Sequence, residues 1–438
     1  MGARVCRQRS RSATMGGREM KKIAYAMVGA SGLLLLAAMS TQAQAAVSCG
    51  LNNGQAATGE PIKVGAIVGE TGPDDFSSSA DAAAAYFACV NANGGINGRP
   101  IQYIVEDDQW NPEVAVQVGT KLVRDDKVVA LVGSGSFVEM SMNAKLYEAD
   151  GVMSMASACA VSECFESRNI VSTNEGPLPS SVGAAQWAVA NLGSKNVVCI
   201  GINIPSVGQY SCGWTEKYMT SRGLAGSSIL LDTAAVDLNA AVLQAVASGA
   251  DTVLVNLPAG LAAGFLKTVE EQGLKENFKW ISSTPLYDAD IPGLLGPGWV
   301  DVMHVNIELT PIDGTGEDAV NWRAIMDAYA KPEDPRDTFS QSGYLSAKFF
   351  VEAMLELDPA AIDRATVTEA IKAIKNKTSD LLCGPYYVGD APTHMPNHAN
   401  MMVKVTADGF AVVGECTDVD SAYLGPVRAA EKALGIGR

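Results

Sequence analysis

The chain has 438 residues, with 32 Lys and Arg against 48 Asp and Glu, and therefore a formal charge of −16 at pH 7. A strongly negative protein repels polyanions, so nucleic acid and anionic membrane surfaces are excluded as expected partners. The length exceeds what one hydrophobic core usually supports and predicts two domains.

The chain begins with a segment that predicts export. Residues 20–22 are Met-Lys-Lys, residues 23–39 form an apolar run of 17 residues, and residues 43–45 are a small-residue cleavage pattern. These features are typical of a secretory signal peptide, which we predict over residues 1–45, with 1–19 the product of an upstream start codon. A retained membrane anchor is the alternative. Removing residues 1–45 removes seven basic residues and one acidic residue, which changes the formal charge from −16 to −22.

Eight of the nine cysteines lie beyond the leader, and an even number in an exported chain favours disulfides. Buried free thiols are the alternative. Cys49 lies too far from the apolar run to favour a lipid anchor. There is no C-x-x-C pattern and no His–Cys cluster that would suggest zinc. Proximity in the chain suggests three pairs and leaves Cys49 and Cys89 unassigned: Cys159–Cys164, Cys199–Cys212 and Cys383–Cys416.

The first half of the mature chain alternates short apolar runs with helical segments. Such alternation is typical of parallel strands that are buried on both faces and joined by right-handed crossovers. We expect strands at 62–68, 101–106, 128–132 and 152–155, and helices at 81–91 and 114–125.

A second series begins after residues 174–177, Asn-Glu-Gly-Pro. The two halves therefore use the same α/β architecture twice. We expect a helix that ends at residue 221, and further helices at 181–191, 238–247, 262–272, 319–330, 344–357 and 366–373. The expected strands are 196–202, 228–231, 251–256, 280–282, 300–307, 384–388, 401–405 and 410–413.

Small and hydroxyl residues follow two neighbouring strands of the first series. Residues 133–136 follow the apolar run 128–132, and residues 156–158 follow the run 152–155. In parallel sheets, ligands bind beyond the carboxyl ends of the strands, where helix N-termini offer free N–H groups. We therefore hypothesise a small-molecule site on these two turns.

Signals for catalysis or for a cofactor are weak. A dinucleotide fingerprint at 133–135 lacks its third glycine, because Val138 stands at that position. His304 lies in an apolar strand and is predicted to be structural. His394 and His398 are four residues apart, as in a metal clamp on a helix, but the proline between them argues against that helix. We expect no catalytic group, no cofactor and no metal.

Six stretches of this chain resemble the type I periplasmic solute-binding proteins of branched-chain amino-acid ABC transporters. The likeness runs from about Gly59 to about Glu415 and covers nearly the whole mature chain. The stretches are IKVGAIVGETGP at 62–73, CVNANGGINGRPIQYIVEDDQWNPEVAVQ at 89–117, ALVGSGS at 130–136, LYEADGV at 146–152, SGYLSAKFFVEAM at 342–354 and CGPYYVG at 383–389.

The resemblance implies an α/β fold with two Rossmann-like lobes, each with a parallel central sheet, joined by a hinge of three crossings. Lobe 1 would comprise residues 60–177 plus 313–382, and lobe 2 residues 178–312 plus 383–425. Residues 426–438 would be a C-terminal tail.

The resemblance also implies which residues contact a ligand. In lobe 1 these are the first loop and the two turns: Asp74, Phe76, Ser134, Gly135, Ser136, Phe137, Ser157, Ala158 and Cys159. Gln209, Tyr210, Asn256, Pro258, Thr284 and Pro285 would close over the other side, with Gln341 as a weaker candidate. Backbone N–H groups of the two turns would hold a carboxylate or a carbonyl.

The chain departs from the family at two positions that bear on specificity. Amino-acid-binding relatives use hydroxyl side chains where this chain has Phe137 and Ala160. Either a shifted pose uses nearby serines, or the ligand is an aromatic or aliphatic acid, an amide or another metabolite. A structural role is the alternative to ligand contact for several of these residues. The serines would then be helix caps, Phe137 a core residue or pocket wall, and Tyr210 would pack within its own lobe.

The expected function is an exported, monomeric, periplasmic binding protein, not an enzyme. It would capture a small polar or carboxylate-bearing solute by Venus-flytrap closure and deliver it to the membrane permease of an ABC transporter. The alternatives are a ligand-sensing receptor for a membrane signalling protein and an enzyme on the same fold. Turnover of a bound ligand would identify an enzyme, and neighbouring permease genes would indicate transport.

Overall fold

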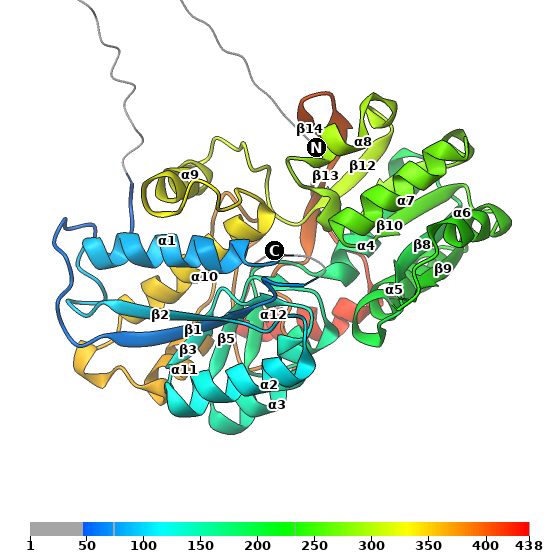
Figure 1. Ribbon diagram of the computed structural model, residues 1–438. Coiled ribbons are helices and arrows are strands. Elements are labelled where there is room, and N and C mark those ends of the chain that lie inside the picture. The colour runs from blue at the N-terminus through cyan, green and yellow to red at the C-terminus, as the bar shows by residue number, and fades with distance from the viewer. Residues whose placement is uncertain (1–46, 73–74, 233, 438) are drawn as a thin grey trace, which may run out of the picture. The chain divides into compact units, whose positions relative to one another are not determined.

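A computed structural model describes residues 47–72, 75–232 and 234–437 (Figure 1). The predicted signal peptide and Asp74 lie outside the described residues. In the part of the chain that is described, none of the helices combines the length and the apolar character needed to cross a membrane.

The first sheet is built from seven parallel strands that lie between residues 62 and 172. Six of the strands follow the order β6-β4-β1-β3-β5-β7, and the seventh, β2, pairs with β1 outside this path. Val64 lies opposite Ala130, and Ala130 lies opposite Met153, as buried strands of a parallel sheet require. The strands are β1 (Ile62–Val68), β2 (Ile101–Asp107), β3 (Ala130–Val132), β4 (Gly135–Ser136), β5 (Met153–Ala156), β6 (Ala158–Cys159) and β7 (Ile170–Ser172).

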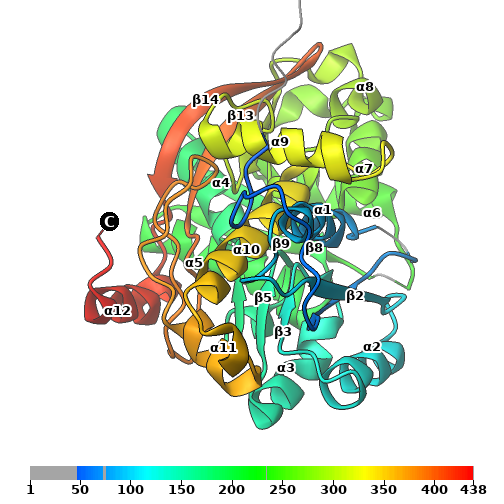
Figure 2. The ribbon, with the colours of Figure 1, turned by 90° about the vertical axis from the view of Figure 1, so that its left-hand side faces the viewer.

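Helices from two distant parts of the chain cover this sheet. Asn111 starts α2 by accepting hydrogen bonds from the N–H groups of Glu113 and Val114, and Gly151 ends α3 in a left-handed conformation. The later helix α10 packs against α1, and Figure 2 shows the two side by side. The helices are α1 (Ser78–Ala92), α2 (Pro112–Thr120) with a π-helical extension (Lys121–Asp125), α3 (Glu139–Asp150), α9 (Glu317–Tyr329), α10 (Thr338–Leu355) and α11 (Arg364–Lys372).

The second sheet has the order β14-β13-β12-β11-β10-β8-β9. Five strands are parallel, whereas β13 and β14 run antiparallel at one edge, so the sheet is mixed. The strands are β8 (Asn196–Ile202), β9 (Ala225–Leu231), β10 (Thr252–Asn256), β11 (Lys279–Ser282), β12 (Met303–Ile307), β13 (Ala399–Thr406) and β14 (Gly409–Asp418). The helices of this part are α4 (Pro177–Asn191), α5 (Tyr210–Ser221), α6 (Leu238–Ala247), α7 (Ala259–Glu271), α8 (Ile291–Leu295) and α12 (Gly425–Leu434).

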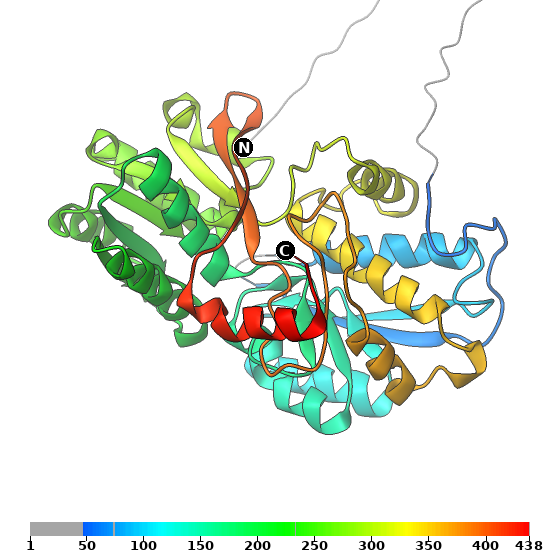
Figure 3. The same cartoon turned by 180° about the vertical axis from the view of Figure 1, so that it is seen from behind.

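Three segments of the chain run between the two sheets. The first follows β7 and leads into α4, the second follows β12 and leads towards α9, and the third leads from α11 back to β13. Figure 3 shows the third, in orange, from behind. Asn397 of this third segment donates hydrogen bonds to the carbonyl oxygens of Thr173 (3.2 Å) and Glu308 (2.8 Å), which joins all three segments.

The predicted α/β chain with two mostly parallel sheets is confirmed, with corrections in detail. The strand expected at 384–388 is wrong. Only an isolated bridge between Lys377 and Tyr386 forms there, because Tyr386 is buried against Phe349 (ring centroids 5.0 Å apart) instead of joining a sheet. The strand β7 and the helix α12 were not expected.

Candidate ligand pocket between the two sheets

A cavity lies where the carboxyl ends of both sets of strands meet. Several of its lining residues lie just after the end of a strand: Phe137 follows β4, Leu257 follows β10, Glu308 follows β12, and Asn174 lies two residues after β7. Open α/β sheets bind ligands at this end of their strands. The lining residues are Phe76, Phe137, Ala158, Cys159, Ala160, Asn174, Gly176, Pro177, Ser180, Ile202, Val207, Asn256, Leu257, Pro258, Thr284, Pro285, Glu308 and Phe339.

One side of the cavity is an aromatic wall, which we define as Phe76, Phe137, Phe339 and the supporting Trp110. Phe76 lies with its ring centroid 5.1 Å from Phe137 and 5.6 Å from Phe339. The indole of Trp110 stacks on Phe137 at 4.7 Å and 20°. Such offset contacts hold rings firmly, so the wall presents a preformed apolar surface to a ligand.

Trp110 is held in place by a buried carboxyl group. Its backbone has a φ of 55°, which is uncommon for a residue other than glycine. The side chain of Asp108 accepts a hydrogen bond from the Trp110 N–H (2.9 Å) and another from the Ser136 hydroxyl. Burial raises the pKa of Asp108, and the hydrogen bond from Ser136 opposes that shift. The turn therefore depends on a polar anchor beneath the aromatic wall.

The polar end of the cavity is centred on Glu308. Its Oε2 accepts hydrogen bonds from the N–H groups of Glu175 (3.1 Å) and Gly176 (3.3 Å) and from the Asn174 amide (3.3 Å). Burial raises the pKa of Glu308 to about 7, although these hydrogen bonds favour the ionised form. Gly176 has a φ of 80°, and a Cβ there would collide with the ring of Phe165, so the segment requires glycine.

Two further polar side chains face the cavity, Ser180 from α4 and Asn256 from the end of β10, and both are hydrogen-bonded within the protein. The Ser180 hydroxyl donates to Asn306 (2.9 Å), and the Asn256 amide donates to the hydroxyl of Ser211 (2.6 Å). Asn256 also accepts from Ser283 (2.9 Å). These bonds fix the orientation of the side chains before any ligand arrives.

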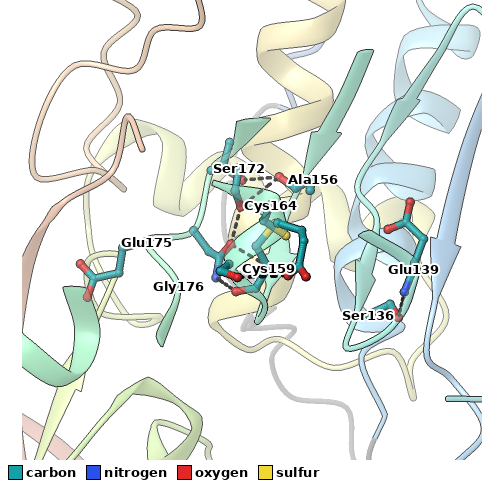
Figure 4. The surroundings of a disulfide bond; sticks show 12 residues. Ser136, Glu139, Ala156, Cys159, Cys164, Ser172, Glu175 and Gly176 are labelled. Carbon is teal, nitrogen blue, oxygen red and sulfur yellow. Dashed lines mark hydrogen bonds between the residues drawn. A yellow bond between two sulfur atoms is a disulfide. The ribbon is translucent and has the colours of Figure 1, made fainter. Parts of the chain in front are cut away.

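A disulfide between Cys159 and Cys164 supports the polar end of the cavity (Figure 4). The Asn174 side chain accepts a hydrogen bond from the Cys159 N–H (2.9 Å) and thereby links the disulfide loop to the segment after β7. In Figure 4 the Glu175 side chain points away from the disulfide, and it accepts a hydrogen bond from Asn400 (3.0 Å). The structure also contains the two other pairs expected from proximity, Cys199–Cys212 and Cys383–Cys416. It joins the two cysteines that the sequence left unassigned as a fourth pair, Cys49–Cys89.

Residues 61–410 match the family model of the periplasmic binding proteins. The chain belongs to this family. A curated amino acid binding protein from Pseudomonas aeruginosa is 27% identical to this periplasmic binding protein over 194 residues, which are 43% of this chain and 51% of the relative. The chain therefore spans about half the length of the curated relative that it matches.

Solved structures of low sequence identity share the fold. A possible leucine/isoleucine/valine-binding protein from Rhodopirellula baltica matches with a TM-score of 0.71 at 16% identity, over 83% of this chain and 97% of that one. A solute-binding protein of an ABC transporter from R. palustris, in complex with 4-hydroxybenzoate, matches with a TM-score of 0.70 at 19% identity, over 84% of this chain and 100% of that one.

The structure brings half of the sequence-predicted contact residues together around the cavity of this periplasmic binding protein. Ala160, one of the two positions that depart from the amino-acid-binding pattern, also lines it, as does Phe137. The predicted residues that line the cavity are Phe76, Phe137, Ala158, Cys159, Asn256, Pro258, Thr284 and Pro285.

The predicted serines do not line the cavity. Their hydroxyls have partners in the first sheet, at the start of α3 and in α10. Ser134 accepts a hydrogen bond from the Ile67 N–H (3.1 Å), and Ser157 donates to Ser346 (2.8 Å). Ser136 accepts from the first N–H groups of α3, as a cap. Gly135 lies under the loop: a Cβ there would come within 3 Å of Ser79 and Ala158.

Three other predicted residues lie outside the lining. Gln209 donates a hydrogen bond to Asn203 (2.9 Å), and Tyr210 packs on the ring of Tyr423 at 5.5 Å. Gln341 is fully buried in α10. Prediction from sequence missed several lining residues, above all Glu308 and Asn174. The signal for Glu308 was its position directly after a strand, and the signal for Asn174 was its place in the expected break at 174–177.

The histidines have structural surroundings. The Nδ1 of His394 faces the Ser167 carbonyl oxygen (2.8 Å), and burial lowers the His394 pKa. The Nε2 of His398 lies 2.9 Å from Glu431. His304 is half-buried beside Trp187, with ring centroids 4.8 Å apart. The described residues contain no group of three His, Cys, Asp or Glu side chains arranged to hold a metal ion.

Proposed function

We propose that this protein is the extracytoplasmic substrate-binding component of an ABC importer, and that it captures a small solute in the cavity between the two sheets. The observation that carries the proposal is the lining itself, which comes from the carboxyl ends of strands in both sheets. A cavity with an apolar wall and few polar groups is typical of a small-molecule site.

The solute is held by closure of two lobes in this proposal. We infer lobe 1 at residues 60–177 plus 313–382 and lobe 2 at residues 178–312 plus 383–425, with the three connecting segments as the hinge. The hydrogen bonds of Asn397 and Glu308 support a hinge at these segments, because they join all three. Hinge closure of this kind shifts the protein from an open to a closed population when ligand binds both lobes.

The candidates for the solute follow from two lining residues. Phe137 and Ala160 offer no hydroxyl group to an α-amino acid, which supports a solute other than a branched-chain amino acid. The aromatic wall suits a solute with an aromatic or aliphatic body. Small polar and carboxylate-bearing metabolites are therefore the candidates, and 4-hydroxybenzoate, which the R. palustris protein holds, belongs among those to be tested.

Several features support export and delivery to a permease. Four disulfides are expected in an oxidising compartment outside the cytoplasm. The N-terminal sequence is typical of a cleaved leader, and the family is named for periplasmic binding. We propose a monomer that docks on the membrane permease of its transporter and performs no chemistry on the solute.

The proposal is tested by thermal denaturation of the purified protein with a panel of solutes. The panel comprises amino acids, aromatic and aliphatic carboxylates, amides, amines and sugars. A ligand at 100 times its dissociation constant adds about 2.7 kcal/mol to the free energy of unfolding, which raises the melting temperature measurably. We expect at least one solute to do so without being converted. A folded, ligand-free protein that none of them stabilises would contradict solute capture.

A further inference from the structure

The charge of the cavity lining is unusual for a site that would bind an anion. Among the described residues that line it, Glu308 is the one acidic side chain, and there is no Lys, Arg or His. Carboxylates are usually held by Arg, by Lys or by several free N–H groups. A carboxylate in this cavity would therefore depend on backbone N–H groups or hydroxyls alone.

Several of the backbone N–H groups expected to hold a carboxylate are already donated within the protein. On the turn after β5, the N–H groups of Ser157 and Ala158 donate to the Ser134 carbonyl oxygen at 2.9 and 3.2 Å. The Cys159 N–H donates to the side chain of Asn174 (2.9 Å). On the turn after β4, the N–H groups at the start of α3 donate to Ser136.

The N-terminus of α4 offers few donors either. The N–H groups of Glu175 and Gly176 donate to Oε2 of Glu308, and residues 177 and 179 are prolines, which have no N–H. An anion at this helix end would therefore find most of the usual donors absent or paired.

Among the described side chains of the lining, Glu308 carries an oxygen atom without a hydrogen-bond partner in the protein. Glu308 is only 2% exposed, and its Oε1 is buried without a hydrogen-bond partner in the protein. The other polar side chains of the lining, Asn174, Ser180, Asn256 and Thr284, all make hydrogen bonds within the protein. Burial raises the pKa of Glu308 to about 7, as expected for a carboxyl group that lacks a cation.

We propose that the solute is a primary amine with an apolar body, whose ammonium group donates a hydrogen bond to Oε1 of Glu308 while its body packs on the aromatic wall. This inference rests on the proposed solute capture and, among the candidate solutes, selects a polar amine over a carboxylate. An ammonium group supplies the opposite charge and the N–H donor that the buried carboxyl group lacks. The rings of Phe76, Phe137 and Phe339 supply the apolar surface, with their faces favourable to a cation.

The test compares ligands that share one body and differ in the head group. Benzylamine, benzamide and benzoate, and likewise butylamine and butyrate, are titrated into the purified protein at pH 8 with thermal shift and calorimetry as readouts. We expect the amines to bind most tightly and the carboxylates most weakly. Equal or tighter binding of benzoate or benzamide than of benzylamine would overturn the proposal.

Two isosteric variants locate the effect. In Glu308→Gln the amide oxygen keeps the place of Oε2, because three donors meet there, so the amide nitrogen takes the place of Oε1 and becomes a donor. We expect benzylamine to bind at least about tenfold more weakly and benzoate to bind more tightly. The control is Glu175→Gln, a buried carboxyl group outside the lining, which should leave the head-group order unchanged.

The outcomes separate this inference from the proposed function. If Glu308→Gln binds benzylamine like the wild type, or if Glu175→Gln changes the order equally, Glu308 is not the anchor. If Glu308→Gln does not fold, the head-group order of the wild type alone decides. If no amine binds but another solute of the wider panel does, the amine inference fails and solute capture stands. If nothing binds, both fail.

Discussion

The carboxyl group of Glu308, directly after β12, accepts a hydrogen bond from the backbone N–H of Gly176, directly before α4, at 3.3 Å. These residues belong to two of the three segments that run between the sheets, and both line the cavity. The same carboxyl group therefore contributes to the hinge and to the proposed ligand site. A group in that position couples the geometry of the crossings to what occupies the cavity.

Removing this carboxyl group should destabilise the protein. In Glu308→Ala the N–H groups of Glu175 and Gly176 and the Asn174 amide lose their acceptor in a buried place, so the free energy of unfolding should fall by about 2–4 kcal/mol. Glu308→Gln retains an acceptor and should lose clearly less. Urea denaturation of both variants measures the difference, and equal losses would show that these hydrogen bonds contribute little.

The aromatic wall should matter more for binding than for folding. Phe137→Ala removes a half-buried ring that lines the cavity and stacks on Trp110. We expect ligand affinity to fall about tenfold, from the loss of roughly 1–2 kcal/mol of apolar contact. Phe278→Ala is a matched control, because that half-buried ring packs on Trp280 away from the cavity. Similar losses of affinity in both variants would argue against an aromatic wall.

Two of the disulfides should differ in what they support: Cys49–Cys89 mainly the stability of the fold, and Cys159–Cys164 mainly ligand binding. The Cys49–Cys89 pair spans 40 residues and the Cys159–Cys164 pair only 5, so their removal as serine pairs should lower the free energy of unfolding by about 4 and about 2 kcal/mol, respectively. Binding should show the opposite order, since Cys159 lines the cavity and Cys49 does not. Calorimetric titration of the two double variants checks this, and weaker binding in the Cys49–Cys89 variant would contradict it.

A buried acid in α3 should make stability depend on pH. Glu139 is fully buried, accepts a hydrogen bond from the Tyr147 hydroxyl, and has its pKa raised by burial from 4.5 to about 8. Because the folded state binds the proton more tightly, this contribution to stability is present below pH 4.5 and is lost as pH rises through 8.

Glu139→Gln should therefore lose less stability than the wild type between pH 5 and pH 9. The measurement is the melting temperature across that range. The exposed Glu148→Gln on the same helix should keep the wild-type profile. An unchanged profile in Glu139→Gln would show that Glu139 is ionised in the folded protein without penalty.

Much of the fold could be predicted from sequence, because it depends on local periodicity. The run at 62–68 is apolar enough to require burial on both faces, and it forms β1 with the expected bounds. The stretch at 384–388 shows the limit of this reasoning. An apolar run can be buried under a helix as well as in a sheet, and Tyr386 packs on Phe349 of α10. The helix α12 was missed although its apolar and charged residues recur with a helical period, because it is short and begins at Gly-Pro.

The candidate site was harder to predict, because side-chain direction is not encoded locally. The turns after β4 and β5 do lie at the cavity, but the Ser134 hydroxyl bonds to β1 and the Ser157 hydroxyl to Ser346 of α10. Glu308 was missed because its role depends on donors about 130 residues earlier in the chain. Only the folded chain brings those donors to it.

The most direct measurement of the central claim is ligand binding by a variant whose cavity is filled. Ala160 lines the cavity and is half-buried, so Ala160→Trp adds a large ring there with little disturbance of the core, and Ala160→Ser serves as its control. With the best solute from the thermal panel, calorimetry should show binding to the wild type and to Ala160→Ser but none to folded Ala160→Trp. Unchanged affinity in Ala160→Trp would place the solute elsewhere and contradict the account.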